Sequence, residues 1–74
     1  MGKIKIKISN SIRRLRFEND EMTQLQLAKA SGVSRQTINN IESEKYYPSL
    51  ELAFLIANAL NSNIEEVFVQ DKGE

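Results

Sequence analysis

Residues 23–43 read TQLQLAKASGVSRQTINNIES, and they carry the clearest structural signals in the chain. It opens with Thr23, a residue type that caps helices, and Gln26 follows three positions later, as a capping box requires. The Ser-Gly-Val step at 31–33 predicts a turn, because glycine adopts the positive φ that ends a helix and redirects the chain. Ser34 then caps another helix. The stretch therefore predicts two short helices joined by a tight turn.

The second of these helices has one apolar side and one polar side. At about 100° per residue, Ile38 and Ile41 fall together. An Arg side chain can donate two hydrogen bonds to guanine, and Gln and Asn amides can match adenine in the same way. An ordinary solvated helix face is the alternative, but such a face more often carries Glu and Lys. We therefore predict a helix that reads base edges of double-stranded DNA through Arg35, Gln36, Asn39 and Asn40.

Length and composition exclude several classes of protein. The 74 residues predict a single domain over 1–74, and the chain has no Cys and no His. Thiolate and imidazole metal ligands, a cysteine nucleophile and a histidine base are therefore absent, and we expect no enzyme, no metal site and no cofactor. The longest apolar run, residues 52–57, is far shorter than the ~18–20 residues that cross a bilayer. We accordingly expect a cytoplasmic protein.

The formal net charge of zero conceals an uneven distribution. Residues 1–35 carry eight Lys and Arg against three acids, a net charge of +5. Residues 36–74 carry two Lys against seven acids, a net charge of −5. A small domain divided in this way predicts one surface that attracts phosphate.

The two ends of the chain predict short strands. Lys and Ile alternate strictly over residues 3–8, and Val67, Phe68 and Val69 begin a second alternating stretch over about 67–70. We expect these strands to pair as an antiparallel ribbon. The lysines of the first strand would form a solvated face that discourages aggregation, or would supply additional phosphate contacts.

Three further helices are predicted between the strands. Ile12 and Leu15 mark a first helix over 9–19, Ser49 caps a helix over 50–61, and Asn63 caps a last short helix. The helix from residue 50 is apolar on nearly every side, so it must be covered on more than one side. We expect a second copy of the chain to cover part of it. The predicted dimer interface consists of Ile4, Ile6, Leu52, Leu55, Ile56, Val67 and Val69.

The stretch 24–43 resembles the helix-turn-helix of the phage-repressor family of regulators, the lambda repressor and Cro type, also called XRE-like. The matching positions are Gln24, Leu27, Ala28, Gly32, Val33, Ile38 and Ile41. The flanking segments are similar to small stand-alone, cytolysin-repressor-like members, and the resemblance covers about residues 9–70. It implies a mainly α, five-helix, lambda-repressor-like DNA-binding domain with a two-stranded antiparallel ribbon formed by the terminal strands.

The resemblance also implies roles for single residues. Gln24 would contact a phosphate and brace the recognition helix, and Asn39 would contact either phosphate or bases. Arg16 and Glu42 match a pair that forms a partly buried ion pair. Glu44 stands where the family usually has Gly, in a left-handed position that is costly for other residues. The remaining DNA phosphate contacts would be made by Ser34, Thr37, Lys45 and Tyr46.

The function implied is a transcriptional regulator that binds a palindromic operator as a homodimer, and repression by blocking polymerase is the simplest mechanism. A protein–protein module is the alternative, such as an antitoxin or adaptor that uses the apolar helix 50–60 to bind a different protein. The partners expected are double-stranded DNA and a second copy, with no membrane and no small-molecule ligand.

Overall fold

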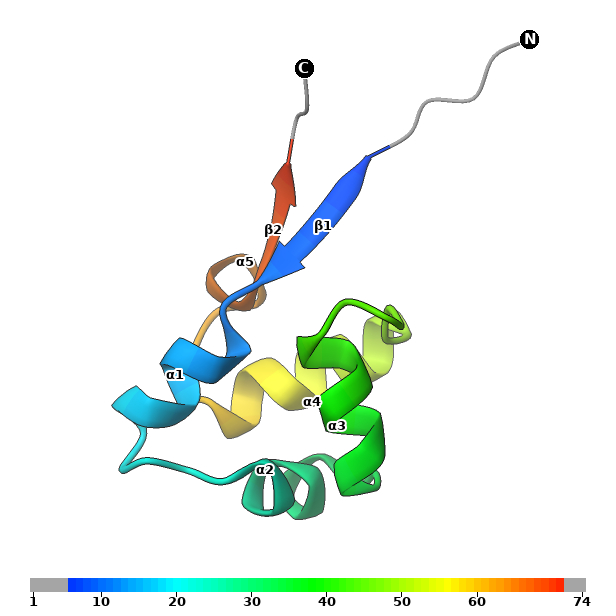
Figure 1. The fold of residues 1–74 in the computed structure, drawn as a ribbon. Coiled ribbons are helices and arrows are strands. Elements are labelled where there is room, and N and C mark those ends of the chain that lie inside the picture. Colours follow the sequence, from blue (N-terminus) through cyan, green and yellow to red (C-terminus); the bar gives the residue numbers. More distant parts are fainter. Residues whose placement is uncertain (1–5, 72–74) are drawn as a thin grey trace, which may run out of the picture.

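Within residues 6–71, five helices enclose one apolar core, and two strands leave it as a ribbon (Figure 1). The computed structural model describes residues 6–71. Its mainly helical class and its two-stranded antiparallel sheet confirm the predicted fold. The elements are β1 (Lys7–Asn10), α1 (Ile12–Glu18), α2 (Gln24–Ser31), α3 (Arg35–Glu42), α4 (Leu50–Ala59), α5 (Ile64–Val67) and β2 (Phe68–Asp71).

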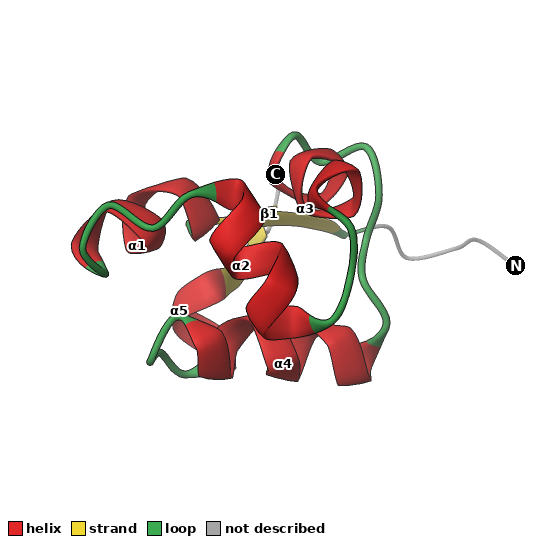
Figure 2. Ribbon diagram, turned by 90° about the horizontal axis from the view of Figure 1, so that it is seen from below, coloured by secondary structure: helices red, strands yellow, loops and turns green. Residues whose placement is uncertain are grey.

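The core takes at least one side chain from every helix. Figure 2 shows α2 lying across α4, with α1 and α3 to either side. The two apolar residues of α3, Ile38 and Ile41, face this core, which leaves the polar side of the same helix to solvent. The largest fully buried side chains are Ile12, Leu27, Ile38, Ile41, Ile56, Leu60 and Val67. Within residues 6–71, no helix is both long and apolar enough to span a membrane.

The helix starts follow the capping residues that the sequence predicts. Thr23 Oγ1 accepts a hydrogen bond from the backbone N–H of Gln26 at 3.0 Å, and the N–H of Thr23 donates to Gln26 Oε1 at 2.9 Å. The side chains of Ser34 and Ser49 each accept from the N–H three residues later, at 3.1 and 3.2 Å. Each cap satisfies a backbone donor that has no partner inside its helix, and so fixes where that helix begins.

The N-terminal strand lies later in the chain than predicted. It spans Lys7–Asn10 instead of 3–8, and residues 1–5 lie outside the described residues. The first helix accordingly begins at Ile12, not at residue 9. The reason is Asn10: its Nδ2 donates to the carbonyl of Ile41 at 3.0 Å, and its Oδ1 accepts from the N–H of Ile12 at 3.2 Å. These bonds tie the strand to α3 and hold Asn10 extended.

The C-terminal strand also differs by one residue. It begins at Phe68, since Val67 still belongs to α5, and it pairs antiparallel with β1 so that Asn10 faces Phe68 and Lys7 faces Asp71. Phe68 is half-buried against the core. This contact gives the ribbon the packing that two strands alone would lack.

Three residues predicted at a dimer interface are instead part of the core of a single chain. Leu52 is 9% exposed, and Ile56 and Val67 are fully buried. Assigning them to the interface was wrong, because side chains already covered by their own chain have no surface left for a partner. The apolar pattern of α4 could not show which side faces inward, since nearly every position of the helix is apolar.

Other apolar side chains remain on the surface. Among the predicted interface residues, Ile6, Leu55 and Val69 are exposed, and Ile4 lies outside the described residues. Leu50 is the most exposed of the large apolar residues, at 71%, and Phe54 on the next turn of α4 is 48% exposed. The outer side of α4 thus keeps an apolar strip that no part of the described chain covers.

Left-handed backbone occurs at several turns. Gly32 ends α2 with φ of 78°, as predicted, and Glu44 after α3 has φ of 65°. The turn after α1 carries two such residues, Asp20 with φ of 59° and Glu21 with φ of 55°. A residue with a side chain is strained in this region by roughly 1–2 kcal/mol.

We predict that Gly32→Ala destabilises the fold through its backbone alone. An added Cβ at this position would meet no atom within 4 Å, so the cost comes from the positive φ and not from a clash. The expected loss in the free energy of unfolding is about 1 kcal/mol. Urea denaturation measures it. Gly32→Asn is the control and should lose less, because Asn tolerates the left-handed region; equal losses for the two variants would contradict this explanation.

Candidate nucleic-acid interface

The polar side of α3 forms the centre of the candidate interface. Arg35 and Gln36 are exposed on its first turn, and Asn39 and Asn40 are half-buried one turn later. These are the four predicted base-reading residues, and α3 brings them together because its apolar residues hold the opposite side in the core. The first turn of a helix also carries unsatisfied N–H groups and a positive dipole end, which favour phosphate.

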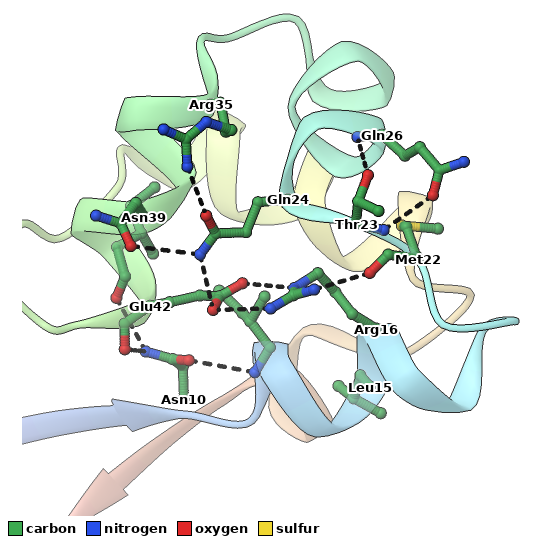
Figure 3. Close-up of polar contacts among 12 residues, drawn as sticks. Asn10, Leu15, Arg16, Met22, Thr23, Gln24, Gln26, Arg35, Asn39 and Glu42 are labelled. Carbon is green, nitrogen blue, oxygen red and sulfur yellow. Dashed lines mark hydrogen bonds and ion pairs between the residues drawn. The ribbon is translucent and has the colours of Figure 1, made fainter.

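Gln24, the first residue of α2, connects several of these side chains (Figure 3). Its Oε1 accepts a hydrogen bond from Arg35 Nη1 at 3.2 Å. Its Nε2 donates to Glu42 Oε1 at 3.2 Å and to Asn39 Oδ1 at 3.4 Å. A Gln amide nitrogen carries two hydrogens, so both are engaged. In the free protein Gln24 therefore braces Arg35 and Asn39. To contact a phosphate, its amide nitrogen would have to exchange or share one of its two hydrogen bonds.

The brace rests on an ion pair between α1 and α3. Arg16 Nε lies 2.7 Å from Glu42 Oε2, and Arg16 Nη2 lies 3.2 Å from Oε1 of the same carboxylate. Arg16 Nη1 also donates to the carbonyl of Met22 at 2.8 Å, just before α2 begins. The two side chains are only 12% and 11% exposed. This one pair therefore fixes α1, the start of α2 and the end of α3 relative to one another.

A second contact joins two of the residues predicted to read bases. Gln36 Nε2 donates to Asn40 Oδ1 at 3.1 Å, one helical turn apart. The bond leaves the Gln36 oxygen as an acceptor and the Asn40 nitrogen as a donor. An adenine edge in the major groove offers the complementary pair, an N6 donor and an N7 acceptor. The bonded pair thus keeps one acceptor and one donor for such an edge.

The predicted phosphate residues lie at the two ends of α3. At its start, Ser34 Oγ lies 2.9 Å from Thr37 Oγ1, so the two hydroxyl groups are adjacent. At its end, Lys45 and Tyr46 are exposed in the loop that leads to α4. Glu44 stands beside them, and its carboxylate lies 3.9 Å from Lys7 Nζ. A lysine from β1 thus reduces the negative charge that a phosphate would meet at this loop.

Two residues of α1 that were not predicted as part of the interface lie beside it. Arg13 and Phe17 are both exposed, and the Arg13 guanidinium lies over the Phe17 ring, 6.0 Å from its centroid. A phenylalanine next to the apolar positions of α1 is ordinarily expected inside, but Phe17 is 56% exposed. The available signal was their spacing: Phe17 follows Arg13 by four positions, which places the two side chains on the same side of a helix.

Two short helices at the predicted turn, with a braced polar face on the second, define a helix-turn-helix DNA-binding domain. The comparison with known families agrees. Residues 12–67 match the family model described as helix-turn-helix, and the chain belongs to that family.

Several named relatives are similar over most of their length. An uncharacterized HTH-type transcriptional regulator of Methanocaldococcus jannaschii is 53% identical over 53 residues, which cover 72% of this chain and 80% of that protein. One of Archaeoglobus fulgidus is 51% identical over 72% of this chain and 75% of its own length. One of Bacillus subtilis is 38% identical over 82% of this chain and 91% of its own length. The chain is therefore similar to transcriptional regulators over most of its length.

A solved structure supports the fold as well. A Bacteroides fragilis protein described as a "putative DNA-binding protein" superposes with a TM-score of 0.73 at 30% sequence identity. The match covers 82% of this chain and 97% of that one. The shared fold extends beyond the two helices of the motif.

We predict that Glu42→Ala costs about 3 kcal/mol of unfolding free energy, because it leaves the Arg16 charge without its partner in a largely buried site. The double variant Arg16→Met/Glu42→Leu should recover most of that loss, since no unpaired charge remains. Urea denaturation of the single and double variants measures both effects.

The control is the ion pair within α1 between Arg14 and Glu18, whose charged atoms lie 3.0 Å apart. Their side chains are 60% and 55% exposed. Arg14→Met/Glu18→Leu should change the unfolding free energy by less than about 1 kcal/mol. The single variants Arg16→Met and Glu42→Leu complete the cycle, and a double variant that loses the sum of these two single losses would contradict the pairing.

Proposed function

We propose that this protein is a sequence-specific transcriptional repressor that binds a roughly palindromic DNA operator as a homodimer. One chain would insert α3 into the major groove of one half-site. Arg35, Gln36, Asn39 and Asn40 would read base edges, and the ends of α3 would contact phosphates. A second chain would read the other half-site, about 34 Å away along the same side of the duplex.

The observation that carries DNA reading is the set of bonds that arranges the polar face of α3. Arg35 and Asn39 both bond to Gln24, and Gln36 bonds to Asn40. Side chains held in this way lose less conformational entropy when they meet bases than free ones would. Repression is the simplest consequence of such binding, since a protein that occupies a promoter excludes polymerase from the same DNA.

The homodimer is supported by the exposed apolar strip on α4 together with the ribbon. Leu50 and Phe54 lie on adjacent turns, and beside them a cleft of about 330 Å³ is lined by apolar residues, among them Ile8 and Phe68. A soluble domain rarely leaves such a continuous apolar surface without a partner. A different protein could also cover it, as in an antitoxin or adaptor, so the oligomeric state of the isolated protein discriminates between the two functions.

We predict that Arg35→Ala relaxes specificity at one base pair of each half-site and weakens binding by about 1–3 kcal/mol. Selection of bound duplexes from random-sequence DNA, performed with both proteins, measures the preference at every position. Lys29→Ala removes the same charge from an exposed position at the end of α2 and should leave the selected sequence unchanged. An identical preference for wild type and Arg35→Ala would refute the base-reading role.

For the dimer, we expect light scattering after size-exclusion chromatography to give twice the mass of one chain. The double variant Leu50→Ser/Phe54→Ser should shift the protein toward monomer without unfolding it, because both side chains are exposed within one chain. Leu25→Ser changes an exposed apolar residue of α2 and should remain dimeric. A wild-type protein that runs as a monomer at micromolar concentration would contradict the homodimer and favour the protein–protein module.

A further inference from the structure

A cleft of about 450 Å³ opens beside α3, between that helix, α1 and the start of α2. Gln24 and Asn39 line one part of it, so it borders the face proposed to read DNA. Arg13 and Phe17 of α1 line the other part, and neither belongs to the proposed base-reading or phosphate-binding residues. A role of this cleft in binding DNA rests on the proposed function.

The charges around the cleft leave one arginine without an acidic partner. Arg14 pairs with Glu18 and Arg16 pairs with Glu42, at 3.0 and 2.7 Å. Arg13 forms no ion pair within residues 6–71, although it stands on the same helix. Because Glu42 is matched by Arg16, the charged residues of the cleft sum to +1, and that excess is the charge of Arg13.

Phe17 restricts where the Arg13 side chain lies. The guanidinium over the aromatic ring, at 6.0 Å from its centroid, is within the range of a cation–π contact. A cation–π contact uses no N–H hydrogen bond, so the guanidinium N–H groups that bind phosphate bidentately stay available. The aromatic residue thus positions a cation and leaves its donors available.

We propose that Arg13, positioned by Phe17, binds a DNA backbone phosphate in this cleft. A helix is roughly 10–12 Å wide with its side chains, and the major groove of B-DNA is about 12 Å wide. When α3 lies in the groove, the phosphate backbones that border the groove must therefore pass along the sides of α3. The cleft lies along one of those sides, and Arg13 is its unpaired cation.

The test compares Arg13→Gln with Arg14→Gln. The two substitutions remove the same charge from adjacent positions of one helix, but only Arg13 lines the cleft beside α3 without an acidic partner. We expect Arg13→Gln to weaken binding about fivefold on the selected operator and on an unrelated duplex alike. It should also reduce the slope of log affinity against log salt by about one. Arg14→Gln should change both quantities much less.

Two further variants separate charge from position. Arg13→Lys keeps the charge and should retain most of the salt slope. Phe17→Leu keeps an apolar side chain but removes the ring, and it should weaken binding about twofold with the slope nearly unchanged. Urea midpoints close to that of the wild type would show that the fold is intact, as expected for two exposed residues.

Equal effects of Arg13→Gln and Arg14→Gln would overturn the phosphate site and leave the DNA-binding function standing. An effect of Arg13→Gln on the selected sequence, without a change in salt slope, would overturn it too, because that result describes a base contact. A wild-type protein that binds neither duplex would remove the proposed function together with the site.

Discussion

The ion pair between Arg16 and Glu42 is the contact on which the arrangement of the DNA-binding face depends. Its distance of 2.7 Å and its low exposure mean that neither group can be removed without leaving a charge in a poorly hydrated place. Because Arg16 also bonds to the carbonyl of Met22, the pair connects α1 with both helices of the motif. The contact thus ties α1, which lies outside the motif, to the start of α2 and the end of α3.

Short-range signals made much of this fold predictable from sequence. Thr23 and Gln26 are three residues apart, and their mutual hydrogen bonds need no contact with a distant part of the chain. The same holds for Gly32, whose positive φ follows from the turn alone. The solvent-facing polar side of α3 was predictable because Ile38 and Ile41 fix which way the helix faces. The Arg16–Glu42 pair, in contrast, was expected only from the family resemblance, since 26 residues separate its members.

What could not be predicted depends on packing between distant segments. In α4 nearly every residue is apolar, so the pattern does not show which side turns inward, and Leu52 and Ile56 were misplaced for that reason. The strand β1 continues to Asn10, where a helix was expected, because Asn10 bonds to a carbonyl at the end of α3, 31 positions away. Phe17 lies exposed beside Arg13, although a phenylalanine near an apolar stripe is ordinarily expected inside. In each case the residue type is compatible with two positions in the fold, and tertiary contacts determine which one it takes.

The bonds within the interface bear on how it could meet DNA. Arg35 is exposed and held by a single 3.2 Å bond to Gln24, so exchanging that bond for guanine would cost little. Glu42 is different, because Gln24 and Arg16 both bond to its carboxylate in a site of low exposure. The side chains proposed to read bases would thus be placed largely during folding, through the Arg16–Glu42 pair and its bond to Gln24. The final adjustment is left to weak, exposed bonds that bases can replace one for one.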